Sequence, residues 1–124
     1  MGDRGHIVIE QYGETAAPVV LYTHWYATEL PQIVADALSH EKRWSDHEYL
    51  ARIIFDELSA RSSDFTGCGI GTQKHGDTWR TIVVDPNNQT VSFTDPNGFK
   101  SCPHRGLTFE FNEFVDEFLE VATI

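Results

Sequence analysis

The sequence predicts a single α+β domain spanning residues 1–124, an antiparallel sheet with three helices packed mainly on one face, in the order ββααβββα. Three observations predict it. The 124 residues are 40% hydrophobic and 12% aromatic, which is enough for one core. Short β-branched segments are separated by turn residues, which indicates antiparallel strands. Two segments carry apolar residues at helical spacing, and no linker divides the chain.

The first two elements are expected to form a β-hairpin. Residues 7–12 alternate in polarity and are rich in β-branched side chains, which is typical of a strand. Residues 13–17 supply a turn, and residues 18–25 (PVVLYTHW) form the second strand. Because the connection is short, we expect the two strands to pair antiparallel.

Two helices follow the hairpin. Thr28 is the expected N-cap of the first helix, and Pro31 fits its first turn. The second helix begins with a capping box, in which the Ser45 hydroxyl accepts a backbone amide and Glu48 returns to the N–H of the cap. The apolar faces of the two helices consist of Leu30, Ile33, Val34, Ala37 and Leu38, and of Leu50, Ile53, Ile54 and Leu58.

The second half of the chain returns to strands. Residues 62–76 form a glycine-rich connection that contains a short strand near residues 68–72. Residues 79–85 (WRTIVVD) and 90–94 (TVSFT) are predicted to pair as a hairpin.

Turn signals separate the last elements. Asp-Pro-Asn-Asn at residues 85–88 is typical of a type I turn, and Asp-Pro-Asn-Gly at residues 95–98 is a second turn of this kind. Residues 99–105 fit either a short edge strand or a loop. Residues 106–124 are expected to form the terminal helix.

The terminal helix is expected to have two contrasting faces. Its segment holds five acids and no Lys or Arg, in a chain with a formal net charge of -10. On a helix the acids fall within about 120° of the circumference, opposite the apolar side chains. The apolar arc consists of Phe111, Phe114, Val115, Phe118 and Leu119, and the acidic stripe consists of Glu110, Glu113, Asp116, Glu117 and Glu120.

The acidic stripe is the strongest functional signal in the sequence. Solvated helix faces are often charged, but no basic residue interrupts this one, and Glu120 opposes the helix dipole. We therefore expect the stripe to contact a basic protein surface, with Asp56 and Glu57 as further contributors.

The charge balance argues against some classes of function. The chain has 9 Lys and Arg against 19 Asp and Glu, which disfavours direct binding to nucleic acid because phosphate contacts need cationic side chains. A high-salt host is an alternative explanation of this acidity. The sequence has no apolar run of membrane-spanning length and no signal peptide, so we expect a cytoplasmic protein without membrane contact.

A second group of residues is a candidate ligand-binding site. His24 and Trp25 lie where the first hairpin meets the first helix, although an imidazole there needs a partner to act as an acid or base. Cys68, His75 and His104 are further candidates for this site, because thiol and imidazole side chains can bind ligands or act in catalysis.

Two other patterns favour structural explanations. The GCGIG segment at residues 67–71 follows a helix, and its third glycine is one position early for a dinucleotide fingerprint. Four aromatic residues could line either a groove or the core. They are Trp25, Tyr26, Trp44 and Tyr49.

A zinc site is a weaker alternative. Cys68, His75, Cys102 and His104 offer thiolate and imidazole ligands, but their spacing is irregular. We therefore expect no metal and no cofactor. In a cytoplasmic chain the two cysteines are expected to be free thiols.

Three stretches of sequence form a recognisable pattern. They are YTHW at residues 22–25, RWSDHEYLARII at 43–54, and GIG at 69–71 leading to WRTIVV at 79–84. Together they resemble a group of small uncharacterised proteins from bacterial, archaeal and phage or plasmid genomes, over most of residues 5–94. The resemblance implies a mobile-element or accessory setting, and it gives no residue a catalytic role.

Three functional hypotheses follow. The first is an acidic, non-enzymatic binding module, a phage or mobile-element inhibitor that mimics nucleic acid and occupies a basic channel of a host defence protein. The second is a small-ligand or nucleotide-binding protein, or a small hydrolase, with its site near His24, Cys68 and His104. The third is a homo-oligomer that forms through an exposed strand edge.

Overall fold

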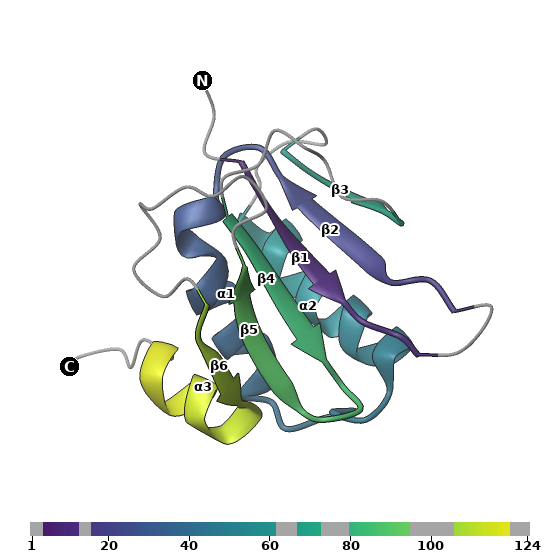
Figure 1. The fold of residues 1–124 in the computed structure, drawn as a ribbon. Helices are drawn as coiled ribbons and strands as arrows, with labels where there is room; N and C mark the ends of the chain where they lie inside the picture. The colour runs from purple at the N-terminus through teal and green to yellow at the C-terminus, as the bar shows by residue number, and fades with distance from the viewer. Residues whose placement is uncertain (1–3, 13–15, 62–66, 73–79, 95–105, 120–124) are drawn as a thin grey trace.

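A six-stranded mixed sheet is the centre of the fold (Figure 1). The computed structural model describes residues 4–12, 16–61, 67–72, 80–94 and 106–119. The strand order is β3-β2-β1-β4-β5-β6. The strands are β1 (Gly5–Ile9), β2 (Val19–Thr23), β3 (Cys68–Gly71), β4 (Arg80–Asp85), β5 (Thr90–Thr94) and β6 (Thr108–Glu110). The α+β class predicted from the sequence is confirmed.

The two central strands pair in parallel, which corrects the expectation of a fully antiparallel sheet. Gly5 lies opposite Arg80, and Ile9 lies opposite Val84. The other four strand pairs are antiparallel. A parallel pair needs a long crossover, and the chain between β1 and β4 supplies one because it contains β2, two helices and β3.

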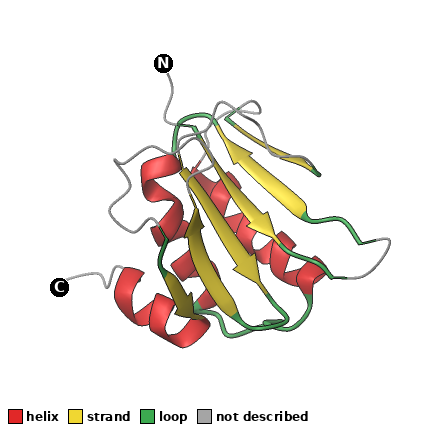
Figure 2. Ribbon diagram, viewed as in Figure 1, coloured by secondary structure: helices red, strands yellow, loops and turns green. Residues whose placement is uncertain are grey.

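Three α-helices and a short 3₁₀ helix complete the described part of the chain. They are η1 (Ala27–Glu29), α1 (Leu30–Leu38), α2 (His47–Arg61) and α3 (Phe111–Phe118). Helices α1 and α2 pack on each other and lie behind the sheet in the view of Figures 1 and 2. Helix α3 lies at the edge of the sheet, where it contacts β6 and α1. None of the described helices is long and apolar enough to cross a membrane.

The start of α1 differs from the expected start. Thr28 lies inside η1, so it is not the N-cap of α1, which is Glu29. Pro31 lies in the first turn of α1, as predicted. The Thr23 hydroxyl accepts a hydrogen bond from the Tyr26 N–H (3.1 Å), which fixes the chain where it leaves β2 and enters η1.

Asp46, and not Ser45, caps α2. The Asp46 Oδ1 atom accepts hydrogen bonds from the backbone N–H groups of Glu48 (3.2 Å) and Tyr49 (3.3 Å). The Asp46 carbonyl also accepts the N–H of Leu50 (2.9 Å), which places Asp46 at the N-cap position. The Ser45 hydroxyl accepts a hydrogen bond from the Gln89 side chain instead.

The end of the chain also differs from the prediction. The segment expected to be helical from residue 106 forms β6 first, and the helix begins only at Phe111. In β6, Thr108 pairs with Ser92 and Glu110 pairs with Thr90. The observed order of the α-helices and strands is therefore ββααββββα. The predicted turn at residues 95–98 and the ambiguous segment 99–105 lie outside the described residues.

The predicted apolar faces of the first two helices form the core. The buried side chains are Leu30, Ile33, Val34, Ala37, Leu38, Leu50, Ile54 and Leu58, whereas Ile53 is only partly buried. Alternation along the strands brings one face of the sheet into the same cluster. That face contributes Ile7, Ile9, Leu21, Ile82, Val84, Val91 and Phe93.

Asp85 organises the turn between β4 and β5. Its Oδ1 atom accepts the backbone N–H groups of Asn87 (3.0 Å) and Asn88 (3.2 Å). Its Oδ2 atom accepts the Asn88 side-chain amide (2.9 Å) and the Tyr12 hydroxyl (2.7 Å). The aspartate thus closes the predicted turn and ties the exit of β1 to it.

Candidate functional site

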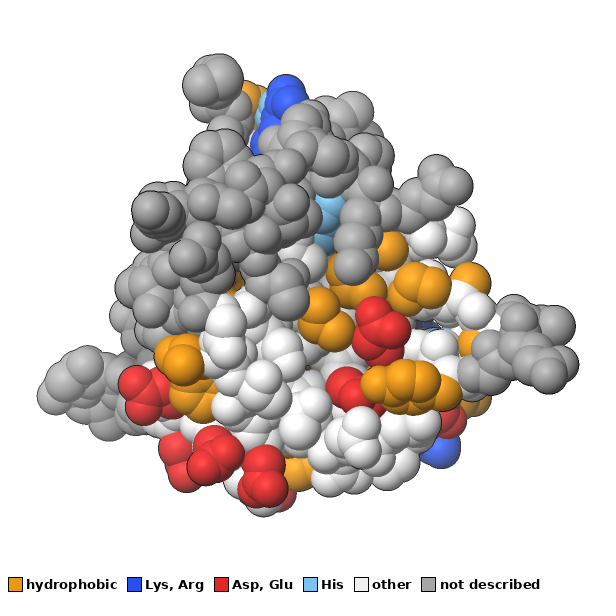
Figure 3. Space-filling view, in the orientation of Figure 1, with side chains coloured by type: hydrophobic (Ala, Val, Ile, Leu, Met, Phe, Trp, Pro, Cys, Tyr) orange, Lys and Arg blue, Asp and Glu red, His pale blue; other side chains and the backbone are white. Residues whose placement is uncertain are grey.

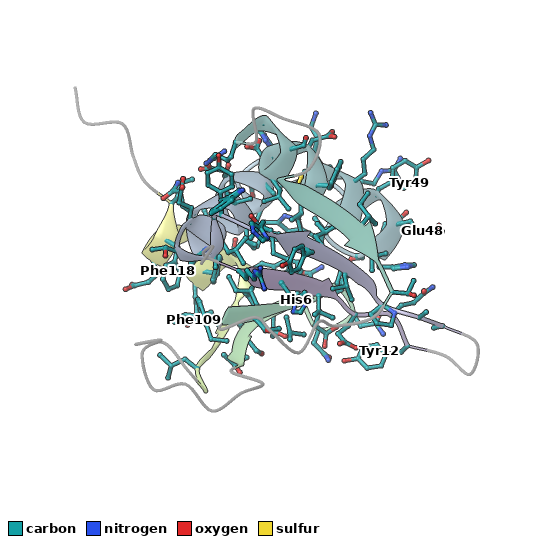
Figure 4. The ribbon with its side chains drawn as sticks, turned by 90° about the horizontal axis from the view of Figure 1, so that it is seen from above. His6, Tyr12, Glu48, Tyr49, Phe109 and Phe118 are labelled. Atoms are coloured by element: carbon teal, nitrogen blue, oxygen red, sulfur yellow. The ribbon has the colours of Figure 1, made fainter. Side chains whose placement is uncertain are left out.

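Helix α3 is anchored by phenylalanine side chains. Phe111 and Phe114 are buried, and the rings of Phe114 and Phe118 lie 4.6 Å apart. The Phe93 ring of β5 lies 5.9 Å from Phe114 and 5.4 Å from Phe118. Phe109 of β6 completes the group, and Figure 4 shows Phe109 and Phe118 at the same end of the molecule. These contacts hold α3 in a fixed orientation on the sheet edge.

The first carboxylates of the predicted stripe shape the start of the helix. Glu110 is the last residue of β6 and the N-cap of α3, with extended backbone angles (φ −71°, ψ 158°). The Glu113 Oε1 atom accepts the backbone N–H of Glu110 (2.9 Å). Glu113 therefore satisfies one of the N–H groups at the end of β6 and contributes to the stability of the helix.

The described members of the predicted stripe face solvent. Glu110, Glu113, Asp116 and Glu117 are all exposed. Glu120 lies outside the described residues. Figure 3 shows acidic side chains gathered at the lower left, over α3 and β6, with no Lys or Arg among them.

The described basic side chains make their contacts elsewhere. Arg61 pairs with Asp36 (2.6 Å) and Glu57 (3.6 Å), and Arg52 pairs with Asp56 (3.7 Å). Asp56 and Glu57, expected to support the stripe, thus have partners of their own: Asp56 pairs within α2, and Glu57 also contacts the His40 ring at 3.1 Å. Among the described residues, no ion pair involves a carboxylate of β6 or α3.

Trp44 lies in a recess beside the stripe. Its indole N–H donates a hydrogen bond to the Leu38 carbonyl (3.1 Å) at the end of α1, and its ring meets Phe111 edge-on at 5.3 Å. A hollow of about 230 Å³ is bounded by Trp44, Glu41 and Asp116. A second hollow of about 190 Å³, bounded by Trp44 and Glu110, adjoins it. Of the aromatic residues considered in the sequence, Trp44 is the one at the stripe.

Three residues of the alternative ligand site share one end of the sheet. Thr23, at the end of β2, lies opposite Cys68 of β3, and the His24 N–H donates to the Gly67 carbonyl (3.0 Å). The His24 and Trp25 rings lie 4.5 Å apart in an edge-on contact, and Trp25 is 53% exposed. His75 and His104, the other residues of this prediction, lie outside the described residues.

The same end of the sheet holds residues that the sequence prediction missed. His6 is completely buried on β1, next to Tyr22 (ring centroids 5.7 Å apart) and opposite Thr81. The Thr81 hydroxyl is buried and has no hydrogen-bond partner among the residues that the structure describes. His6 was missed because the first strand begins at Gly5, two residues before its predicted start. Figure 4 shows His6 on the sheet, away from the helices.

The described residues of this end do not assemble a recognisable catalytic group. Within the described ranges, no hydrogen bond joins the His24 ring to a carboxylate, and no three His, Cys, Asp or Glu side chains are grouped to bind a metal ion. Cys102, His75 and His104 of the zinc alternative lie outside these ranges. No protein-family model, curated protein or solved structure shows significant similarity to the chain.

Proposed function

We propose that this protein is a non-enzymatic binding module that engages a basic, nucleic-acid-binding surface of another protein through the carboxylates of β6 and α3. The observation that carries the proposal is the exposure of Glu110, Glu113, Asp116 and Glu117 on a fixed helix, without an intramolecular ion pair in the described part of the chain. Unpaired carboxylates at a surface are available to attract Lys and Arg of a partner.

The density of charge on α3 is comparable to that of a nucleic-acid strand. Residues 113 and 117 are four positions apart, which is about 6 Å along a helix. Three carboxylates in that length give one charge per roughly 3 Å, against about 3.4 Å per phosphate along one DNA strand. A basic channel that binds a strand would therefore meet a similar charge density on α3.

The accessory setting implied by the sequence resemblance suggests the biological role. A small acidic protein of a phage or mobile element that occupies the nucleic-acid site of a host defence protein would prevent that protein from binding nucleic acid. The partner would be the basic surface of that protein. This mimicry hypothesis predicts competition: the partner should bind either duplex DNA or this protein, but not both.

The proposal is tested by capture from host lysate with immobilised protein, with and without excess duplex DNA. The test variant carries Asp116→Lys and Glu117→Lys. Glu113 is left unchanged because it hydrogen-bonds the backbone at the start of α3. We expect wild type to retain a protein that DNA displaces and that is lost as ionic strength rises, and we expect the variant not to retain it.

A matched control carries Glu29→Lys and Glu48→Lys. Both residues are exposed, and the substitutions change the net charge by the same amount as in the test variant. Figure 4 places Glu48 at the end of the molecule opposite Phe118. The control should capture the partner with nearly wild-type efficiency. Because Glu29 and Glu48 lie at the N-terminal ends of α1 and α2, where Lys is less favourable, circular dichroism first checks that the control is folded. Equal loss of capture in two folded variants would show that net charge alone, and not the α3 surface, is responsible.

A second candidate function is small-ligand binding at the end of β2 and β3. It is supported by the proximity of His24, Trp25 and Cys68 and by the unsatisfied Thr81 hydroxyl on the same sheet. Its test is a thermal-shift screen against nucleotides with wild type and His24→Ala. A ligand that stabilises wild type and not the variant would favour this function.

A further inference from the structure

The hollow beside Trp44 has the dimensions of a side-chain pocket. It lies between the end of α1, the following loop and α3, and its volume is about 230 Å³. Small-molecule sites in proteins occupy about 300–1,000 Å³. The hollow therefore suits one inserted side chain better than a free small molecule.

The aromatic wall of the hollow is held in place from two sides. The hydrogen bond to Leu38 fixes the indole against α1, and the edge-on contact with Phe111 fixes it against α3. Trp44 is only partly buried. A partner side chain can therefore meet an indole surface that needs no rearrangement, which lowers the entropic cost of binding.

Two carboxylates from different elements border the same hollow. Glu41 lies in the loop after α1, and Asp116 lies on α3. Both are exposed, and neither takes part in an ion pair with another described residue. An aromatic ring and two carboxylates that line one hollow have the chemistry that attracts a cation.

The backbone around the hollow adopts costly conformations. Glu41 has φ 54°, and Arg43, which precedes Trp44, has φ 59°. Left-handed backbone of this kind costs about 1–2 kcal/mol for residues other than glycine. The loop that contains these two residues also brings Glu41 and Trp44 to the lining of the hollow.

We propose that this hollow receives an arginine side chain of the partner, with the guanidinium against Trp44 and between Glu41 and Asp116. The inference rests on the proposed function, since it names the side chain that the acidic surface recognises. Arginine fits better than lysine because its planar guanidinium stacks on an aromatic ring and donates in parallel to a carboxylate. Lysine offers a compact, strongly hydrated charge and should bind less well.

The test uses N-acetyl-arginine amide as the probe and the full-length protein. Binding is followed by NMR through the indole N–H resonance of Trp44, which is assigned with the Trp44→Phe variant. We expect the resonance to shift on titration with the arginine amide, to shift less with N-acetyl-lysine amide, and to remain unchanged with the neutral citrulline amide.

Two neighbouring carboxylates of α3 provide a matched pair of variants. Asp116 lines the hollow, whereas Glu117 does not, and both are exposed. Asp116→Asn should weaken arginine binding roughly tenfold, as expected for the loss of a charge-assisted hydrogen bond, and Glu117→Gln should change it less than about twofold. Equal weakening by both substitutions, or no response at Trp44, would overturn the inference.

The capture experiment separates this inference from the proposed function. If capture depends on the α3 carboxylates but the arginine amide does not bind at Trp44, the arginine pocket is refuted. The acidic surface would then attract the partner through its summed negative charge, without a specific arginine site. If the arginine amide binds as predicted and the double charge reversal leaves capture intact, the hollow binds arginine but the captured partner does not use it, so the proposed function and the assignment of the hollow to that partner are both refuted.

Discussion

At the scale of the residue, Asp85 shows how one carboxylate closes a turn. Burial alone would raise the pKa of Asp85, but the hydrogen bonds from Tyr12, from the Asn88 side chain and from the backbone of Asn88 and Asn87 outweigh it. The pKa therefore lies below its ordinary value of 3.8. The same contact raises the pKa of Tyr12, because the Tyr12 hydroxyl donates to the carboxylate. The ionised form of Asp85 is the one that folding favours.

A pH-dependent loss of stability follows from this arrangement. The contribution of Asp85 should be fully present above about pH 4 and should disappear as the pH falls through the lowered folded-state pKa. Asp85→Asn should reduce the free energy of unfolding by about 1–2 kcal/mol at pH 7, and the difference from wild type should shrink toward pH 2. Urea denaturation of wild type and variant at several pH values measures the loss at pH 7 and its change with pH. A difference that stays constant with pH would contradict this explanation.

Single residues were the least predictable level of the structure. The sequence correctly placed a turn at residues 85–88, because proline and asparagine follow an aspartate. It assigned the caps of α1 and α2 to Thr28 and Ser45, one position before the residues observed. Neighbouring Ser and Asp residues are both good caps, and only the register of the helix on the core decides between them.

At the scale of the element, α3 combines anchoring, capping and display of charge. The alternation of phenylalanine and acidic residues predicted its buried and exposed faces, and Phe111 and Phe114 are buried as expected. The sequence did not predict β6, because pairing with β5 satisfies the backbone of residues 108–110 and overrides their helical pattern. Such pairing depends on the partner strand and not on the local pattern of residues 108–110.

Substitution of the carboxylates of α3 should change stability in opposite directions, with a loss at Glu113 and a gain at Asp116 and Glu117. Glu113→Ala removes the hydrogen bond to the Glu110 N–H and should cost about 0.3–1.5 kcal/mol. Asp116→Lys and Glu117→Lys lie near the C-terminal end of the helix, where positive charge is favoured, and should each add about 0.3–1 kcal/mol. Chemical denaturation measures these changes, with Glu113→Gln as the control that keeps a hydrogen-bond acceptor.

This contrast separates structural from functional carboxylates. A variant with Asp116→Lys and Glu117→Lys that is as stable as wild type, or more stable, and yet fails to bind the partner would have lost an interaction and not the fold. If the same variant were instead destabilised by several kcal/mol, the stripe would have a structural role that the contacts of α3 do not show.

At the scale of the whole molecule, the sequence predicted the α+β class and most strands but not their arrangement. Hydrophobic periodicity identified the segments of β1, β2, β4 and β5 because it is a local property. The parallel pairing of β1 with β4 joins segments that are far apart in sequence, and no local pattern specifies it. For the same reason, the sequence did not show that Trp44 and Asp116 border one hollow.

The two candidate sites lie at different corners of the fold. Helix α3 is at the lower left in Figure 1, whereas the end of β2 and the start of β3 are near the top. The exposed carboxylates of β6 and α3 lie at the first corner, and His24, Trp25 and Cys68 share the second. A partner can therefore be assigned to one site or the other by its footprint.

The most direct test of the acidic surface is an NMR footprint of the DNA-displaceable partner on isotopically labelled protein. If the carboxylates of α3 bind it, backbone and indole resonances should shift in residues 106–119 and 38–46, including Trp44, while Thr23, His24 and Cys68 remain unchanged. A footprint centred on His24, Trp25 and Cys68 with α3 unaffected would contradict the proposed function and favour the ligand-site alternative.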